Sequence, residues 1–193
     1  KLAIESSGDL CNSDNLILEP EGRNTAPCIF LSLVELLSKK TNEDELVFIV
    51  PSDHVILNRK GFEETVEKAA ALSKENQSIV TIGIPPHSPH TGFGYIEKGE
   101  GLGDGFAVKS FKEKPQLETA VEYLKSGQYL WNAGIFLFKA DTMLAAYAAH
   151  APEMLTAVRQ SLAKGQDDLG FKRLDAMAWH QVTDISVDYA VLE

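Results

Sequence analysis

The sequence has few cysteines, no excess of basic residues and no long apolar run. Among its 193 residues there are only two cysteines, Cys11 and Cys28, which are too few for a disulfide framework and fit a reducing cytoplasm. The formal net charge of −10 argues against a general nucleic-acid binder, which usually carries a basic face. No apolar run approaches the roughly 18 residues of a membrane span. We therefore expect a cytoplasmic protein that binds neither nucleic acid nor membrane, and we leave a homo-oligomer open.

The two ends of the chain also lack the features of a complete protein. The sequence opens on Lys1, its first clear element begins near Asn15, and residues 187–193 have the pattern of a helix cut short. A chain of 193 residues is nevertheless long enough for one globular domain with a sizeable core. We therefore expect residues 1–193 to be a single domain, truncated at both ends.

Apolar runs and amphipathic segments alternate along the first half of the chain. Runs at 15–18, 46–50 and 78–82 predict strands, and the unbroken run at 46–50 suits a strand buried on both faces of a parallel sheet. Helical spacing of apolar residues predicts helices over about 26–39 and 61–75. The alternation of strand and helix predicts an α/β fold with a doubly wound sheet.

After Gly83 the pattern changes, and a proline-rich loop interrupts the alternation. Pro152 is expected to start a new helical segment. The elements expected in this half are, in chain order, a strand around 94–97, a Gly-rich turn over 99–105, a strand over 106–114, a helix over 117–126, a strand over 135–138 and a mostly helical region over 141–177.

Asp53 follows directly after the apolar run at 46–50. In open α/β sheets, ligands bind outside the carboxyl ends of the strands. Mg²⁺ takes one or two carboxylates together with substrate phosphates. Asp53 is therefore a candidate metal ligand, and the alternative is that its carboxylate caps a turn or the next helix.

The segment 19–27, Glu-Pro-Glu-Gly-Arg-Asn-Thr-Ala-Pro, joins a strand end to a helix start. Asn24 or Thr25 can cap that helix. A functional interpretation adds base recognition, since Asn24 offers hydrogen-bond donors and acceptors to the same crevice. Arg23 could meet a phosphate, or it could pair with a neighbouring glutamate.

Glu113 and Lys114 close the strand expected over 106–114. In a regular strand these neighbours would point to opposite faces. Both can serve one ligand only if the pleat breaks, and Pro115 supplies a reason for the break. The carboxylate could then accept hydrogen bonds from sugar hydroxyls while the ammonium binds phosphate. The alternative is a solvated edge strand rich in lysine.

Two further segments contribute polar or small residues near strand ends. Gly92 and Gly94 lie close enough together to let the backbone approach a ligand, although glycine also serves any tight turn. Asn132 stands at the mouth of an apolar strand, where it could bond sugar hydroxyls. Trp131 is expected to pack rather than to stack on a ligand.

Together, these segments closely resemble bacterial mannose-1-phosphate guanylyltransferases. The resemblance runs from about Asn15 to the end of the chain. The segments that carry it are Glu-Pro-Glu-Gly-Arg-Asn-Thr-Ala-Pro at 19–27, Pro-Ser-Asp-His at 51–54, Gly-Phe-Gly-Tyr at 92–95, Phe-Lys-Glu-Lys-Pro at 111–115, Trp-Asn-Ala-Gly-Ile-Phe at 131–136 and Ser-Val-Asp-Tyr-Ala-Val at 186–191.

The resemblance implies a Rossmann-like nucleotide-diphospho-sugar transferase fold, with a mixed, mostly parallel sheet flanked by helices. It also implies a reaction in which GTP and mannose 1-phosphate give GDP-mannose and pyrophosphate by direct in-line attack. Catalysis would then rest on positioning and on charge neutralisation by Mg²⁺ and lysine. The roles it implies are metal binding for Asp53, a place near the base for Asn24 and Thr25, mannose binding for Gly94, Glu113 and Asn132, and phosphate binding for Lys114.

Two features of the family are missing from the sequence. Its Gly-rich, arginine-bearing triphosphate loop would lie upstream of Lys1, and a second metal-binding aspartate would lie downstream of Glu193. We therefore expect residues 1–193 alone to be inactive. The alternatives are a nucleotidyltransferase for another base or sugar, such as one making dTDP-glucose or ADP-glucose, and a non-catalytic sugar-nucleotide sensor.

Overall fold

The computed structural model describes residues 16–39, 45–168 and 171–192. The chain divides into two compact units, which we call unit 1 (residues 1–40 and 146–191) and unit 2 (residues 41–145 and 192–193). No helix among the described residues has the length and apolarity required to cross a bilayer. The expectation of one nucleotidyltransferase domain over residues 1–193 stays a prediction.

Unit 1 is mainly helical and carries a small sheet of order β1-β8-β7. Strand β8 pairs with β1 in parallel and with β7 in antiparallel orientation. Its elements are β1 (Ile17–Leu18), α2 (Thr25–Ser38), the second half of α5 (Ala140–His150), α6 (Pro152–Ala163), β7 (Gln166–Asp168), β8 (Phe171–Arg173), α7 (Ala176–Trp179) and the π-helical turn η3 (Asp188–Leu192), whose last residue belongs to unit 2.

The core of unit 1 forms where α2 packs against α6 and against aromatic side chains. Phe30 of α2 is fully buried, and its ring centroid lies 5.1 Å from that of Tyr147. The Tyr147 hydroxyl donates a 2.7 Å hydrogen bond to the Ala26 carbonyl oxygen, so the buried phenol is satisfied. Burial raises the pKa of Tyr147, which keeps the phenol protonated.

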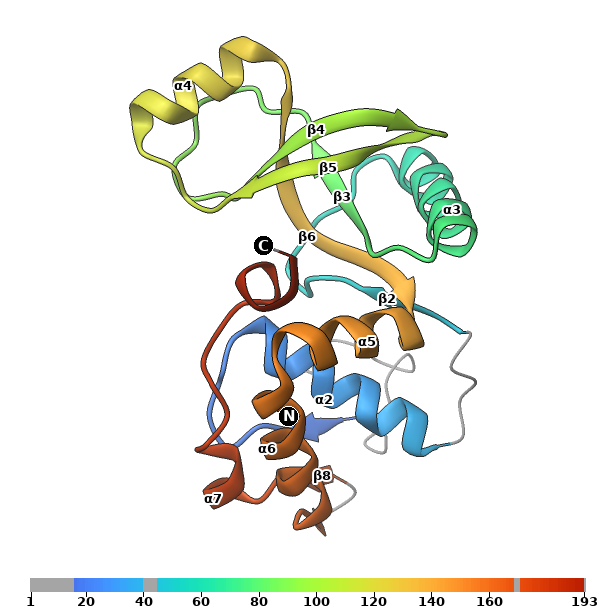
Figure 1. Ribbon diagram of the computed structural model, residues 1–193, viewed down its shortest axis with the longest axis vertical. Coiled ribbons are helices and arrows are strands. Elements are labelled where there is room, and N and C mark those ends of the chain that lie inside the picture. The colour runs from blue at the N-terminus through green and yellow to red at the C-terminus, as the bar shows by residue number, and fades with distance from the viewer. Residues whose placement is uncertain (1–15, 40–44, 169–170, 193) are drawn as a thin grey trace. The chain divides into compact units, whose positions relative to one another are not determined.

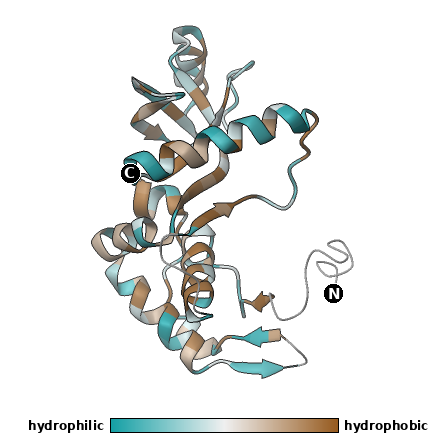
Figure 2. Cartoon of the chain, turned by 90° about the vertical axis from the view of Figure 1, so that its right-hand side faces the viewer, coloured by the Kyte–Doolittle hydropathy of each residue, from teal (hydrophilic) through white to brown (hydrophobic). Residues whose placement is uncertain are grey.

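Unit 2 is built on a five-stranded sheet of order β2-β6-β4-β5, with β3 paired to the other edge of β6. Helix α3 packs against β3 and β6, and α4 packs against β6 (Figure 1). In Figure 2 β6 is coloured mainly as hydrophobic, whereas α3 mixes hydrophilic and hydrophobic residues along its length. The elements are β2 (Leu46–Ile49), α3 (Arg59–Asn76), β3 (Val80–Ile84), β4 (Tyr95–Leu102), β5 (Gly105–Lys112), α4 (Leu117–Ser126) and β6 (Tyr129–Lys139).

The predicted α/β class, with helices flanking the sheet, is confirmed, and the three helices predicted at 26–39, 61–75 and 117–126 appear as α2, α3 and α4. The directions of the strands, however, differ from those of the mostly parallel sheet that was predicted. Strands β2 and β3 run in the same direction, as a βαβ crossover through α3 requires. However, β6 lies between them and is antiparallel to both, so every pairing described in this sheet is antiparallel.

The prediction that the strand at 46–50 is buried on both faces was wrong. Strand β2 is only partly buried, and Phe48 is 38 % exposed. The turn predicted over 99–105 is present but is confined to residues 103–104, because β4 and β5 form a hairpin in which Gly103 adopts φ +55°. The prediction of a mostly helical region over 141–177 is confirmed by α5, α6 and the start of α7. The polar hairpin β7–β8 is the exception, and its three-residue strands carry no apolar alternation that could have predicted them. The start of α6 at Pro152 is confirmed.

Candidate functional site

Four of the predicted site residues meet in unit 2 around Gly94, which directly precedes β4. The Asn132 amide of β6 donates a 2.8 Å hydrogen bond to the Gly94 carbonyl oxygen, and the Lys114 amide donates a 3.2 Å bond to the Phe93 carbonyl oxygen. A Cβ atom at position 94 would lie 2.6 Å from Glu113 Oε2 and 3.5 Å from Asn132 Cβ. Glycine at this position therefore lets Glu113 approach the backbone more closely than a residue with a Cβ atom would allow.

The break in the pleat that the sequence predicted between Glu113 and Lys114 is present. Strand β5 ends at Lys112, and Lys114 adopts φ +42°, a left-handed conformation that costs energy for a residue with a Cβ atom. The Lys114 ammonium lies 3.2 Å from Glu113 Oε1. The Glu113 side chain is 18 % exposed and that of Lys114 is 65 % exposed. The largely buried Glu113 carboxylate and the exposed Lys114 ammonium therefore lie side by side. A sugar phosphate needs both, a hydrogen-bond acceptor for its hydroxyls and a cation for its phosphate.

Asn132 is held by its side-chain oxygen. Oδ1 accepts 3.1 Å hydrogen bonds from the Thr81 hydroxyl of β3 and from the Gly134 amide. The side chain of Asn132 is only partly buried, and its Cβ atom lies 3.5 Å from the position that a Cβ atom at Gly94 would take. Thr81 was not among the predicted residues, because a threonine within a predicted strand gives no signal of its own.

An aromatic cluster lies beside Gly94. Trp131 is 6 % exposed, and its ring centroid lies 5.1 Å from that of Phe93 and 4.8 Å from that of His87. His90 stacks on Phe93 at 4.0 Å. The prediction that Trp131 packs is thereby confirmed. The two histidines were missed, since the proline-rich loop 85–90 gave no pattern that tied them to β6.

Asp53 is exposed in the turn that follows β2. This turn borders the Asn132 region, because a Cβ atom at Gly134 would lie 3.6 Å from Pro51 Cγ. Among the described residues, no group of three or more His, Cys, Asp or Glu side chains could hold a metal ion. A single exposed carboxylate still fits Mg²⁺, which completes its shell with phosphate oxygens and water. The assignment of Asp53 as a metal ligand stays a prediction.

The other predicted residues, in segment 19–27 of unit 1, are engaged with the chain itself. Asn24 is the N-cap of α2, where its Oδ1 accepts a 2.9 Å hydrogen bond from the Thr25 amide. The Thr25 hydroxyl oxygen accepts a 2.9 Å hydrogen bond from the Val187 amide, and the Ala26 amide donates to the Ile185 carbonyl oxygen at 3.2 Å. The capping role is therefore present, and base recognition stays a prediction.

Arg23 forms an ion pair with Glu21, one of the two outcomes that the sequence left open. The same guanidinium lies 3.0 Å from His180 Nδ1, which in turn lies 2.9 Å from Glu21 Oε1. Hydrogen bonds from His180 and Arg23 hold the pKa of the Glu21 carboxyl below its usual value. Binding of a phosphate by Arg23 would therefore have to compete with this pair.

Cys28 follows the same segment and is a poor nucleophile. Desolvation and the neighbouring Glu19 carboxylate raise the pKa of the Cys28 thiol to about 11. The thiolate is the reactive form of cysteine, and it is scarce at neutral pH when the pKa is this high. Burial also raises the pKa of Glu19. The chemistry of this segment therefore lies in hydrogen bonding and charge rather than in covalent attack.

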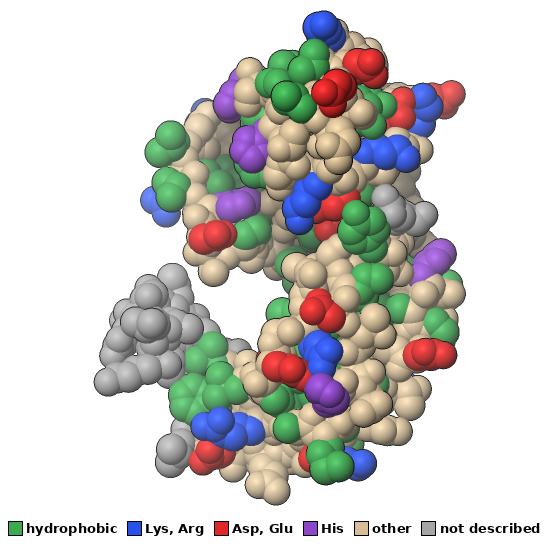
Figure 3. All heavy atoms as spheres, turned by 90° about the vertical axis from the view of Figure 1, so that its left-hand side faces the viewer, with side chains coloured by type: hydrophobic (Ala, Val, Ile, Leu, Met, Phe, Trp, Pro, Cys, Tyr) green, Lys and Arg blue, Asp and Glu red, His purple; other side chains and the backbone are tan. Residues whose placement is uncertain are grey.

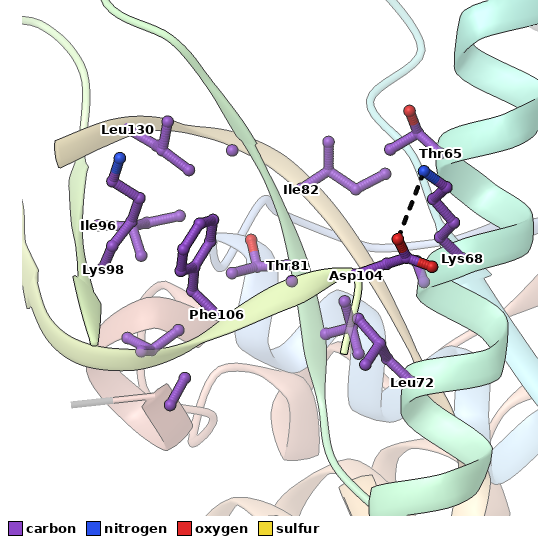
Figure 4. Close-up of a pocket in the computed structure, with 16 residues that line it drawn as sticks. Thr65, Lys68, Leu72, Thr81, Ile82, Ile96, Lys98, Asp104, Phe106 and Leu130 are labelled. Carbon is purple, nitrogen blue, oxygen red and sulfur yellow. Dashed lines mark ion pairs between the residues drawn. The ribbon is translucent and has the colours of Figure 1, made fainter. Parts of the chain in front are cut away.

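Unit 2 also has a cavity of about 330 Å³ between α3 and the strands β3 to β6 (Figure 4). Leu72, Ile82 and Phe106 form part of its apolar wall, and Lys68 pairs with Asp104 at 3.6 Å on its rim. None of the predicted site residues is among the described residues that line it, although Thr81 is. On the protein surface in Figure 3, acidic and basic side chains are interspersed.

Comparison with known proteins agrees with the fold and with the motifs. The chain is 42% identical to the xanthan biosynthesis protein XanB of Xanthomonas campestris pv. campestris over 178 residues. The aligned region covers 92% of this chain and 37% of that protein. It is 41% identical over 182 residues to the mannose-1-phosphate guanylyltransferase RfbM of Salmonella typhimurium, with 94% of this chain and 38% of that protein covered. The chain thus spans less than two fifths of the length of these relatives.

Two solved structures resemble the whole chain. One, described as a mannose-1-phosphate geranyltransferase from Thermus thermophilus, has a TM-score of 0.81 and 29% identity, and 52% of it is covered. The other, described as a mannose-6-phosphate isomerase from Helicobacter pylori, has a TM-score of 0.83 and 31% identity, and 73% of it is covered. A family model described as nucleotidyl transferase matches residues 5–186. The chain therefore belongs to the nucleotidyl transferase family.

Proposed function

We propose that the protein carrying this chain transfers GMP from GTP to mannose 1-phosphate, giving GDP-mannose and pyrophosphate. The observation that carries the proposal is the meeting of Glu113, Lys114 and Asn132 at Gly94. These groups combine a carboxylate and an amide for hydroxyls with an ammonium for a phosphate. The names of several relatives, among them the mannose-1-phosphate guanylyltransferase of Escherichia coli at 40% identity, support mannose and guanosine as the sugar and base.

In the proposed reaction, an oxygen of mannose 1-phosphate attacks the α-phosphorus of GTP. A new P–O bond forms in line with the bond between the α-phosphorus and the oxygen that bridges it to the β-phosphorus. This second bond breaks, and the bridging oxygen leaves with pyrophosphate. The chain contributes position and charge to this step. Glu113 accepts hydrogen bonds from the sugar, and the exposed Lys114 ammonium moves from Glu113 to the sugar phosphate, where it lowers the repulsion between the two phosphates.

Mg²⁺ is the metal that we propose for this site, with Asp53 as a ligand. When bound, it would neutralise phosphate charge and orient the nucleotide. The Asp53→Asn variant keeps the shape of the side chain and removes its charge. We expect it to lose Mg²⁺-dependent turnover, and near-normal activity over a magnesium titration would remove Asp53 from the mechanism.

Segment 19–27 is proposed to contact the nucleotide through Arg23, Asn24 and Thr25. Asn24 caps the start of α2, the Thr25 hydroxyl accepts the Val187 amide, and Arg23 pairs with Glu21. The amides of Thr25 and Ala26 already donate within the chain and Pro27 has none, so what supports an anion at this end of α2 is the positive end of the helix dipole. We propose that this end of α2 lies near the guanosine of the bound nucleotide.

A substrate panel tests the proposed function. The complete protein is incubated with Mg²⁺, with each of GTP, dTTP, ATP and UTP, and with mannose 1-phosphate or glucose 1-phosphate, and products are separated by ion-exchange chromatography. We expect GDP-mannose from GTP and mannose 1-phosphate as the dominant product. A preference for dTTP or ATP would assign the protein to another branch of the family. Binding of sugar nucleotides without turnover of any pair would indicate a sensor. Residues 1–193 alone should be inactive in the same assay.

A further inference from the structure

Residues 90–94, which we call the 90–94 turn, directly precede β4. Two carbonyl oxygens of this turn support the candidate site. That of Phe93 accepts the Lys114 amide at 3.2 Å. That of Gly94 accepts the Asn132 amide at 2.8 Å. Lys114 has a φ of +42°, and such a conformation persists only where neighbouring contacts hold it. A side chain that fixes the 90–94 turn would therefore position Lys114 and Asn132 together.

The His90 side chain fixes this turn through its Nδ1 atom. Nδ1 accepts a 3.0 Å hydrogen bond from the Gly92 amide. An amide two residues along the chain is also the donor in an Asx turn, in which an asparagine or aspartate side chain takes the place of the histidine. A backbone N–H can only donate, so Nδ1 carries no proton and the neutral imidazole has its proton on Nε2.

The neighbours of His90 hold its ring and its backbone in this arrangement. A Cβ atom at position 92 would lie 3.0 Å from His90 Cε1, so Gly92 lets the ring approach the backbone of the turn. The ring stacks on Phe93, with the two centroids 4.0 Å apart and the planes inclined by 12°. The hydroxyl of the fully buried Tyr95 donates a 2.8 Å hydrogen bond to the His90 carbonyl oxygen. The start of the turn is thus tied to β4.

His87, three residues earlier in the same loop, is placed differently. Its ring meets that of Trp131 edge to face, with centroids 4.8 Å apart and an interplanar angle of 80°. Of these two histidines, His90 is the one whose side chain bonds to the backbone of the 90–94 turn within the described part of the chain. His87 therefore offers an internal control for a change at His90.

We propose that His90 is a positioning residue for the acceptor sugar. Its neutral imidazole accepts the Gly92 amide and thereby fixes the 90–94 turn. The two carbonyl oxygens of the turn then stay aligned with the amides of Lys114 and Asn132. The proposal deepens the proposed function and rests on it, because the ligand of the candidate site is taken to be a sugar 1-phosphate. His90 acts through the backbone in this role and does not itself contact the sugar.

Two substitutions separate the Nδ1 acceptor of His90 from its ring. His90→Phe keeps a ring that can stack on Phe93 and removes the acceptor. His90→Asn removes the ring and keeps an acceptor for the same amide, since asparagine readily forms this kind of turn. In the complete protein, we expect His90→Phe to raise KM for mannose 1-phosphate about threefold to tenfold, with KM for GTP unchanged, as the loss of one hydrogen bond predicts. His90→Asn should stay within about twofold of the unsubstituted protein.

Three outcomes of this experiment would overturn the proposal. If His90→Asn raised KM for mannose 1-phosphate as much as His90→Phe or more, the ring rather than Nδ1 would matter. If His90→Phe left this KM unchanged, the turn would keep its shape without the histidine. His87→Asn is the control and should stay within about twofold, because the ring of His87 packs on Trp131. An increase in His87→Asn equal to that in His90→Phe would mean that the loop responds to any change.

A measurement without substrate separates this proposal from the proposed function. Backbone amide exchange with solvent is followed by ¹H–¹⁵N NMR. The amides of Gly92 and Lys114 should exchange faster in His90→Phe than in His90→Asn, because the first bonds to Nδ1 and the second to the turn that Nδ1 fixes. If mannose 1-phosphate proved not to be a substrate, the proposed function would fail for all variants, and this comparison would still decide the positioning role. Unchanged exchange at Lys114 in His90→Phe would overturn it.

Discussion

Two regions carry the residues that the motifs singled out, and they differ in how those residues are used. In the first, which we call the β4–β6 cluster (Gly94, Glu113, Lys114 and Asn132), the groups surround a place where a Cβ atom would not fit. In the second, segment 19–27, the side chains bond to their own chain as caps and ion pairs. A motif therefore identifies residues that matter without telling whether they face a ligand or hold the fold.

The strongest test of this difference is Gly94→Ala in the β4–β6 cluster. The added Cβ atom would lie 2.6 Å from Glu113 Oε2 and 2.7 Å from Phe111 Cζ, both too close. Glu113 can swing away, but the ring of Phe111 is buried and has little room. Displacement of the carboxylate by about 1 Å should lower kcat/KM for mannose 1-phosphate at least about 100-fold, as measured in steady-state assays.

Gly101→Ala is the matched control for this change. Gly101 lies in β4, and a Cβ atom there would meet nothing within 4 Å. We expect its kcat/KM for mannose 1-phosphate to equal that of the unsubstituted protein. Equal activity of Gly94→Ala and Gly101→Ala would mean that Gly94 does not border a sugar site.

The β4–β6 cluster shows how far the sequence could lead. Pro115 after Glu113 and Lys114 predicted the break in the pleat, because a proline cannot continue a ladder. The order and direction of the strands could not be predicted from the sequence. The apolar run at 46–50 is the same whether its neighbour is parallel or antiparallel, and only the tertiary structure shows β6 inserted between β2 and β3. Thr81 was not predicted either, because its partner Asn132 lies 51 residues away and only the tertiary structure brings the two together.

In segment 19–27 the backbone at Asn24 is strained. Its φ of 67° and ψ of −169° lie in a region that is essentially restricted to glycine, at a cost of about 1–3 kcal/mol. Asn24→Gly would relieve this strain, and it would lose only a few tenths of a kcal/mol as a cap together with about 0.5–1 kcal/mol of chain entropy. We expect a net gain of about 1 kcal/mol in the free energy of unfolding, measured by urea denaturation. A simultaneous rise in KM for GTP would show that the strain is kept for nucleotide binding.

Asn58→Gly provides the comparison within the same chain. Asn58 is also an N-cap, with Oδ1 3.0 Å from the Gly61 amide, but its φ of −101° carries no such strain. This substitution should therefore lower the free energy of unfolding by about 1 kcal/mol, the sum of the same two losses. If both variants were destabilised to the same extent, the backbone conformation at Asn24 would not lower the free energy of unfolding.

The smallest effect is expected at the ion pair between Glu21 and Arg23. Because the pKa of Glu21 is lowered, the ionised pair is present above the ordinary carboxyl range and is lost as pH falls through the lowered value. At neutral pH the pair is therefore intact and holds Arg23 away from other anions. Glu21→Gln should free the guanidinium and lower KM for GTP about twofold, a size typical of exposed pairs.

Glu97→Gln is the control for this last substitution. Glu97 also has a lowered pKa, caused first by its hydrogen bond from Lys109 at 2.5 Å and then by Ser110, but it lies in β4 of unit 2. Glu97→Gln should therefore leave KM for GTP unchanged at neutral pH. A KM for GTP that rises in Glu21→Gln would mean that the pair orients Arg23 for the nucleotide instead of withholding it. The caps and ion pairs of segment 19–27 would then prepare a nucleotide site, and the two regions would no longer differ in how their residues are used, since each also holds one residue with positive φ, Asn24 or Lys114.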